Sequence, residues 1–255
     1  MRTEIIFEDK DILVVYKPAG IATQTSKVGE RDVVSELKNH LKGGYVGVIH
    51  RLDQPVEGLL VFAKNQATAA ALSRQVRAKA SDGDEAGFCK DYLAVVLGKP
   101  EEACGRLENM MVKTADRTAE ILDGAEGKKA VLNYETLETI SKEDYTLSLL
   151  RIRLETGRFH QIRAQLAHIS CPIIGDKKYG SEASIKCAEA LRIRNVSLCA
   201  DRLVLTSWDG KKAVGKSNTD KSNAVKSNAV KDLNDSCEYT HKPMGSLFAE
   251  FAACK

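Results

Sequence analysis

The chain has 255 residues, 43% of them hydrophobic, with a formal net charge of +3 and a pI of about 8.4. This is enough apolar material for one large domain or two small ones, and the mild basicity permits nucleic-acid binding without requiring it. The seven cysteines are scattered and form no Cys-x-x-Cys pair, which argues against a zinc ribbon or a redox motif. No apolar run approaches the roughly 20 residues of a membrane span, and the N-terminus lacks the apolar core of a signal peptide. We therefore expect a reduced, soluble, cytoplasmic protein with no membrane partner, and nothing requires more than a monomer.

The first part of the chain mixes short strands and helices. Apolar patterning predicts strands at 5–7, 12–16, 45–50 and 58–65, and helices at 33–41 and 66–79. Gly43 suits the end of the first helix, and Asn65 is placed to cap the start of the second.

The next part reads mostly as strand, at 89–98, 119–123, 130–140 and 144–156. In the last of these the apolar alternation changes phase, which predicts a bulge near Leu150. Ile162, Leu166 and Ile169 then follow at helical spacing, so a helix is expected to end before Pro172. Strands and helices without regular alternation predict an α+β fold, with flanking helices on a largely antiparallel mixed sheet.

The composition changes after about Thr206. Residues 207–235 repeat Lys-Ser-Asn without apolar periodicity, which is typical of a flexible linker. Residues 236–255 form a tail in which Leu247, Phe248 and Phe251 could dock as a short helix. We therefore divide the chain into a domain over 1–206, a linker and a C-terminal tail.

Three motifs could carry chemistry. The first is His-Arg-Leu-Asp at 50–53, set between two apolar runs; read alone, an Arg–Asp pair usually stabilises a loop, contributing less than about 1 kcal/mol. The second, at 154–163, puts Arg158, His160, Gln161 and Arg163 in or just before the first turn of a helix. Side-chain donors combine there with free helix N–H groups, which favours an anion or polar-edge site over a solvated helix start. The third is Tyr92 in a strand, which in isolation indicates a packing residue.

Taken together and in this order, the motifs resemble the RluA-type family of pseudouridine synthases. The matching segments are EDKDILVVYKPAGI, HRLD followed by GLLVFAKN, KDYLAVV, and LETGRFHQIRAQLAHISCPIIGDKKYG. They span about the first 205 residues, so the resemblance implies that 1–206 is a catalytic domain with the pseudouridine synthase fold. It further implies an isomerase that acts on structured RNA, either rRNA or tRNA, in RNA processing.

The resemblance also implies roles for single residues. Asp53 matches the catalytic aspartate, and Arg163 the arginine that pairs with it. Tyr92 matches the active-site tyrosine that packs on the base, and Arg51 the arginine that fills the RNA stack after base flipping. The remaining polar residues of the motifs, whether supporting the site or contacting RNA, are His50, Arg158, His160 and Gln161.

The chemistry suits these residue types. Isomerisation breaks and re-forms a glycosidic bond without oxidation or group transfer, so no cofactor or metal is expected. A carboxylate can act as nucleophile or stabilise positive charge on the sugar, and an adjacent guanidinium favours its charged form. A uridine inside a stem must be flipped out, at a cost of a few kcal/mol.

Phosphate contacts are expected to supply much of the affinity for RNA. The lysines and arginines that could make them are Lys17, Lys64, Arg74, Arg77, Lys79, Lys177 and Lys178. The chain departs from the family pattern at Glu57, whose carboxylate would repel phosphate, and at Phe159, where threonine is frequent.

Two alternatives stay open at this point. An RNA-binding or RNA-folding protein could keep the same cleft without using it. A glycoside hydrolase usually needs two carboxylates, and Glu57 is the only acid near Asp53 with a plausible place.

Overall fold

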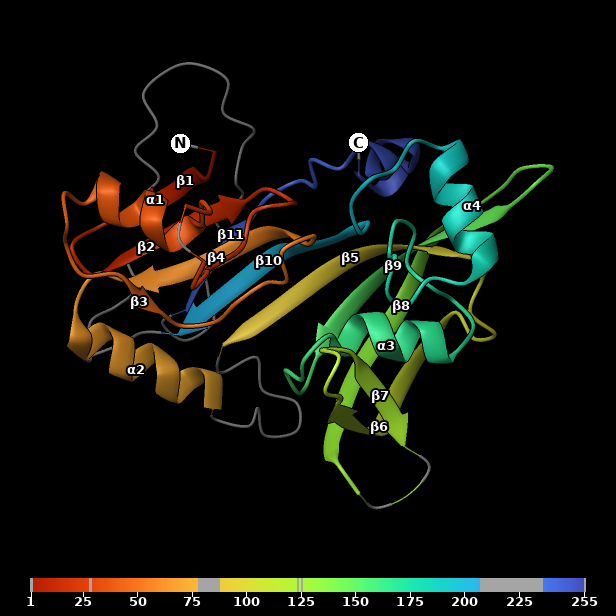
Figure 1. The fold of residues 1–255 in the computed structure, drawn as a ribbon, viewed down its shortest axis with the longest axis horizontal. Helices are drawn as coiled ribbons and strands as arrows, with labels where there is room; N and C mark the ends of the chain where they lie inside the picture. The colour runs from red at the N-terminus through yellow and green to blue at the C-terminus, as the bar shows by residue number, and fades with distance from the viewer. Residues whose placement is uncertain are drawn as a thin grey trace. The chain divides into compact units, whose positions relative to one another are not determined.

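The computed structural model describes residues 2–27, 29–77, 88–122, 124, 126–206 and 236–254. The linker expected at 207–235 lies outside these residues, and so do the last two residues of the helix expected at 66–79. The described part is α+β, as expected, with four α-helices and strands that pair almost throughout in antiparallel fashion (Figure 1). It divides into two compact units, and each element falls mainly within one of them.

The first unit comprises Met1–Leu52, Gly58–Lys90 and Asp201–His241. Its sheet runs in the order β1-β2-β4-β10, with β3 also pairing with β4, and β11 with β10. The strands are β1 Glu4–Glu8, β2 Ile12–Lys17, β3 Gly47–Val48, β4 Glu57–Ala63, β10 Leu198–Thr206 and β11 Ser236–Thr240. Every residue of β2 and β4 is buried, because both faces of these central strands are covered. This explains their continuous apolar runs.

Both helices of this unit begin after a residue whose side chain caps the first turn. Helix α1, Val33–His40, begins after Asp32, whose carboxylate accepts the Ser35 N–H at 2.7 Å. Helix α2, Gln66–Arg77, begins after Asn65, whose Oδ1 accepts the Thr68 N–H at 2.8 Å. The cap expected at Asn65 is therefore confirmed.

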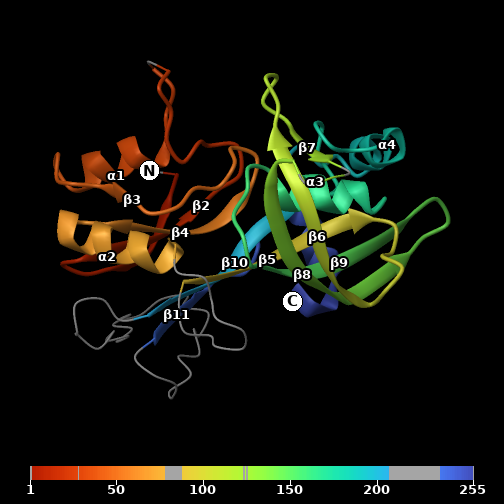
Figure 2. The same cartoon turned by 90° about the horizontal axis from the view of Figure 1, so that it is seen from below.

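The second unit comprises Asp53–Glu57, Asp91–Ala200 and Lys242–Lys255. Five antiparallel strands follow the order β5-β9-β8-β6-β7. They are β5 Cys89–Leu97, β6 Cys104–Lys113, β7 Ala119–Leu122, β8 Lys128–Ser141 and β9 Thr146–Leu154. Helix α3, Gln161–His168, lies against β6, β8 and β7 (Figures 1 and 2), and α4 spans Glu182–Ala190.

The expected bulge lies on a different strand. β9 pairs with β5 in unbroken register, while the register between β8 and β9 shifts between Thr136 and Glu138. These residues pair with Leu150 and Leu149, so the extra residue is Leu137 of β8. The change of phase in β9 has another cause: residues 147–150 are all buried, so both faces of the strand are covered there.

Candidate active site

Asp53 opens a short turn of the second unit. The Val56 N–H donates to the Asp53 carbonyl at 3.1 Å and closes the turn, which leads directly into β4. The side chain of Asp53 is 29% exposed, so its carboxylate stays accessible to solvent. Its Oδ2 accepts a hydrogen bond from Arg163 Nη1 at 3.1 Å and lies 3.5 Å from His160 Nε2. Two side chains of the 154–163 motif, Arg163 and His160, therefore lie against this one carboxylate oxygen.

Arg163 is held mainly by a different acid. It lies in the first turn of α3 with a side chain only 5% exposed, and it grips Asp176 through Nε at 2.7 Å and Nη2 at 2.8 Å. Burial alone would lower the pKa of Arg163, but the hydrogen bonds to Asp176 and then to Asp53 outweigh it and hold this pKa above its ordinary value. Because Asp176 occupies two donors of the fork, Nη1 is aimed at Asp53.

Asp176 belongs to this candidate site although its sequence context did not single it out. Its side chain is fully buried and also accepts the backbone N–H groups of Lys178 at 2.9 Å and Tyr179 at 3.2 Å. The statement that only Glu57 could be a second acid near Asp53 is therefore wrong. The sequence held a signal, because Asp176 comes two residues after the apolar pair Ile173 and Ile174, and an acid buried beside such a pair needs a partner.

His160 connects Asp53 to Tyr179. Its backbone is left-handed, with φ of 51°, directly before α3, and its Nδ1 lies 2.8 Å from the Tyr179 hydroxyl. That hydroxyl accepts the Ala119 N–H at 2.7 Å, so its own proton is available for Nδ1. Burial lowers the pKa of His160 to about 4, which leaves the ring neutral at pH 7. We therefore assign the tautomer with a proton on Nε2, facing Asp53.

Gln161 and Arg158 hold the loop that carries His160. The Gln161 Oε1 accepts the Thr156 hydroxyl at 2.8 Å and the Arg158 N–H at 2.9 Å, and its Nε2 donates to the Val131 carbonyl at 3.0 Å. Of the two roles expected for Gln161, these contacts favour support of the site. Arg158 is exposed and donates from Nε to the Lys129 carbonyl at 2.8 Å, which leaves the end of its guanidinium at the surface.

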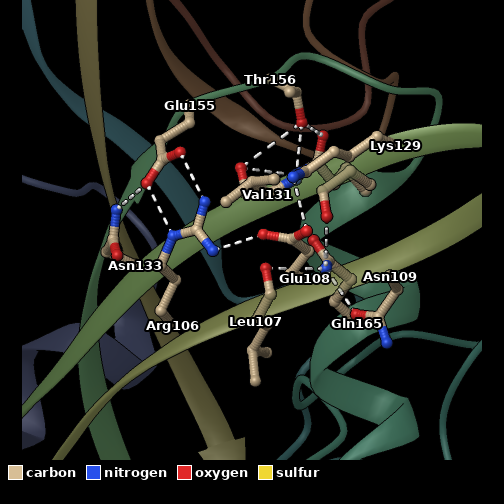
Figure 3. A network of polar contacts seen from close by, with 12 residues as sticks. Arg106, Leu107, Glu108, Asn109, Lys129, Val131, Asn133, Glu155, Thr156 and Gln165 are labelled. Atoms are coloured by element: carbon tan, nitrogen blue, oxygen red, sulfur yellow. Dashed lines mark hydrogen bonds and ion pairs between the residues drawn. The ribbon is translucent and has the colours of Figure 1, made fainter. Parts of the chain in front are cut away.

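A polar network near this loop joins strands β6 and β8 to the end of β9. Figure 3 shows Arg106 of β6 between Glu108 of its own strand and Glu155, which directly follows β9. Gln165 of α3 donates to groups of β6 and β8, including Asn109 Oδ1 at 2.6 Å. These contacts tie α3 to the sheet and so position Arg163, which lies two residues before Gln165 in the helix.

Tyr92 lies on β5 and is 4% exposed. Burial raises the pKa of its phenol, and the negative charge of Asp53 raises it further. The hydroxyl therefore keeps its proton at neutral pH, so the residue offers an apolar ring and a donor but no base.

His50 and Arg51 belong to the first unit. His50 is 8% exposed, its Nε2 accepts the Val61 N–H at 3.3 Å, and its ring meets Phe88 edge-on at 5.0 Å. Burial, and to a smaller extent the charge of Lys90, hold the pKa of His50 well below 6.5. His50 is therefore a neutral side chain that supports β4. Arg51 is exposed, so its side chain can reach a ligand.

Two charged residues lie in other surroundings than expected. Glu57 is 5% exposed and accepts the Gly245 N–H at 2.8 Å, so its carboxylate anchors the C-terminal tail and does not meet phosphate. Lys17 is fully buried and donates from Nζ to the carbonyls of Pro18 and Ile21, which excludes it as a surface phosphate contact. The tail itself forms a 3-10 helix at Ser246–Glu250, where Leu247 and Phe248 are buried.

Residues 11–168 match the RNA pseudouridylate synthase family. The chain belongs to this family. Among similar relatives, the ribosomal large subunit pseudouridine synthase C of Rickettsia conorii is 31% identical over 198 residues, which cover 76% of this chain and 62% of the relative. An uncharacterized RNA pseudouridine synthase of Bacillus subtilis is also 31% identical over 198 residues, covering 76% and 63%. The chain thus spans about three-fifths of the length of these relatives.

Two solved structures share the fold. Human RNA pseudouridylate synthase domain containing 1 superimposes with a TM-score of 0.66 at 22% identity, covering 82% of this chain and 80% of that one. The human domain containing 4 protein gives 0.59 at 22% identity, covering 79% and 84%. These likenesses confirm the expected pseudouridine synthase fold. None of the helices in the described part of the chain is long and apolar enough to cross a membrane.

Proposed function

We propose that this protein converts uridine to pseudouridine within RNA, with Asp53 as the catalytic carboxylate. The observation that carries the proposal is the pairing of a partly exposed carboxylate with a buried guanidinium at 3.1 Å, in a chain of the pseudouridylate synthase family. A reacting acid must be reachable by the substrate, whereas the groups that orient it need not be. Asp53 and Arg163 divide these two tasks.

Asp53 acts on the sugar of a flipped uridine. Its carboxylate either attacks the anomeric carbon or stabilises positive charge as the glycosidic bond breaks. Arg163 keeps the carboxylate charged and oriented, and the Nε2 of neutral His160 faces the same oxygen at 3.5 Å. Tyr92 offers its ring to the base, a stacking contact worth about 1–3 kcal/mol in comparable sites. The bond from the anomeric carbon to N1 breaks and a bond to C5 forms, C5 loses a proton and N1 gains one, so the net reaction is an isomerisation.

Arg51 and Arg158 contact RNA in this proposal. Both are exposed, and Arg51 precedes Asp53 by two residues in the chain. Arg51 fills the gap in the stack that the flipped uridine leaves, while Arg158 and His160 lie at the substrate side of the loop before α3. The buried His50 and Gln161 support these elements from behind. The protein acts as a cytoplasmic monomer.

Ribosomal RNA is the proposed substrate class, because relatives that share 31% identity are named ribosomal large subunit pseudouridine synthases. A hydrolase is not favoured. Asp176 is the second acid near Asp53, but it is fully buried and accepts four hydrogen bonds, so it cannot activate a water molecule on the sugar.

The test uses purified protein with unmodified large-subunit rRNA, small-subunit rRNA and tRNA transcripts. Pseudouridine is mapped by chemical modification and primer extension, and RNA binding is measured separately. Wild-type protein should modify a specific uridine in rRNA, and Asp53→Asn should bind this RNA with unchanged affinity but form no pseudouridine. The matched control Asp144→Asn removes an exposed acid from the β8–β9 turn and should remain active. If wild-type protein binds RNA but converts no uridine, the protein is an RNA-binding protein and not an enzyme.

A further inference from the structure

A cavity of about 300 Å³ lies beside the Arg163–Asp176 pair, in the second unit. It is open to solvent on one side and is bordered by the loop that carries Asp176, by α4, and by the residues that follow α4. Its walls are apolar side chains and its rim is basic: the residues are Ile185, Ala188 and Ile193, and Lys177, Arg192 and Arg194. A volume at the lower end of the ligand-pocket range, which is about 300–1,000 Å³, suits a single small ring system.

The three cations at the rim have no acidic partner. All are exposed, and their side chains make no ion pair or hydrogen bond with the residues that the structure describes. Some exposed lysines of this unit are paired, as Lys129 is with Glu108, and others such as Lys99 and Lys142 make no ion pair with the described residues. What sets the rim apart is that three such cations lie together around one hollow. Three unpaired cations around an apolar hollow therefore complement an anionic ligand with an apolar body.

Two acids also line the cavity, and they differ in availability. Asp176 has both carboxylate oxygens occupied by four donors, so it offers no acceptor to a ligand. Glu189 of α4 is exposed and remains the only lining carboxylate free to accept from one. A ligand with an N–H edge as well as a negative group fits this arrangement.

The walls are fixed before any ligand binds. Gly175 has φ of 82°, and a Cβ at this position would lie 2.0 Å from the Asn195 carbonyl oxygen, so only glycine allows the two loops to pack. Backbone hydrogen bonds from Ser197 to Ile174 and from Ile193 to Ala188, at 2.9 and 2.8 Å, hold the same segments. Preformed walls lower the entropic cost of binding.

We propose that this cavity binds an unpaired nucleotide of the substrate RNA that flanks the target uridine. The base lies against Ile185, Ala188 and Ile193 and stacks on an arginine plane, while its phosphates contact Lys177, Arg192 and Arg194. Asp176 belongs both to this wall and to the pair that orients Asp53. The bound nucleotide therefore sits one side chain away from the catalytic pair, which makes the cavity a specificity site. The inference rests on the proposed function for the identity of the RNA.

The experiment compares three variants of the full chain with wild type on an unmodified large-subunit rRNA transcript. Arg192→Gln/Arg194→Gln removes two rim charges, and Ile185→Trp fills the hollow. The control Lys99→Gln/Lys142→Gln removes two exposed charges of the same unit that do not line the cavity. Affinity is measured as a function of salt, conversion at saturating RNA, and thermal melting by circular dichroism.

Loss of two phosphate contacts should weaken binding about tenfold and lower the slope of log affinity against log salt by about 1–2. Ile185→Trp should weaken binding without changing the salt slope, and the control should stay within twofold of wild type. Unchanged affinity in the double arginine variant, at unchanged melting temperature, would overturn the proposal even if Ile185→Trp fails to fold.

Two further arms separate the possible sources of failure. Uridine 5′-monophosphate is titrated alone; if it binds and the arginine variant abolishes that binding while RNA affinity is unchanged, the ligand is a free nucleotide and the RNA proposal is wrong. Wild-type conversion of uridine tests the proposed function separately. If wild-type protein forms pseudouridine and the cavity variants bind RNA normally, only the cavity proposal is wrong. If the cavity variants bind RNA more weakly but wild-type protein forms no pseudouridine, only the proposed enzymatic function is wrong.

Discussion

Replacing Asp176 with asparagine tests the role of the buried pair. In Asp176→Asn one oxygen remains where it accepts from Arg163 Nη2, Lys178 and Tyr179, but the amide nitrogen replaces the oxygen that accepts from Arg163 Nε at 2.7 Å. Donor then faces donor, and a guanidinium with a side chain only 5% exposed loses its main counter-charge. Breaking a buried ion pair from one side costs about 3–5 kcal/mol, and the retained acceptor places this variant near 3 kcal/mol.

Asp53→Asn is the variant with which Asp176→Asn should be compared. Asp53 has a side chain 29% exposed and accepts one guanidinium hydrogen bond, so its replacement should change the free energy of unfolding by about 1 kcal/mol or less. Urea unfolding followed by circular dichroism at pH 7.5 measures both values. At temperatures where it is folded, Asp176→Asn should also lose about 100-fold in turnover, because Arg163 is no longer fixed. Equal stability of Asp176→Asn and wild type would refute the reasoning.

The remaining predictions concern acid stability and close packing. Because burial lowers the pKa of His160 from 6.5 to about 4, the unfolded chain binds a proton below pH 6.5 that the folded chain does not. The contribution of His160 to the free energy of unfolding should therefore be complete above pH 6.5 and fall by up to about 3 kcal/mol as the pH approaches 4. Asparagine tolerates the left-handed backbone at this position, so His160→Asn should flatten the decline in urea titrations across the same pH range. In Gly245→Ala the new Cβ would lie 3.0 Å from Glu57 Oε1 and 3.2 Å from the Phe248 ring. Thermal melting should therefore show that the free energy of unfolding falls by about 1–2 kcal/mol. A melting temperature equal to wild type would mean that Glu57 does not hold the tail. Gly175→Ala should yield little folded protein, judged by soluble expression and circular dichroism, since its Cβ would lie 2.0 Å from the Asn195 carbonyl oxygen.

Local patterns predicted much of the fold. Helix α2 and its Asn65 cap follow from neighbouring residues, and so does the end of α3 before Pro172, because each depends on a single turn of chain. The sequence did not predict strand β6, because its residues are mostly exposed or half-buried and show little alternation of apolar and polar side chains. The bulge was misplaced because burial of a strand on both faces and an extra residue disturb alternation in the same way.

The site was predictable where a motif is continuous in sequence. Arg163 pairs with Asp53 as expected, and His160 lies against the same carboxylate, because the loop and the first turn of α3 keep their order in space. Asp176 was missed although it stands in a quoted segment, since its partner Arg163 is 13 residues away and only the folded loop brings them together. Glu57 was misjudged for the opposite reason: its partner Gly245 lies 188 residues away, so the sequence gives no sign that the carboxylate is buried.

The most direct test of the account is a map of pseudouridines in total RNA from cells that lack this gene. The account predicts that one or a few rRNA sites disappear, return with the wild-type gene, and stay absent with Asp53→Asn expressed at the same level. If Asp53→Asn restores every site, the carboxylate gripped by Arg163 is not the reacting group. If no site is lost, RNA uridine is not the substrate.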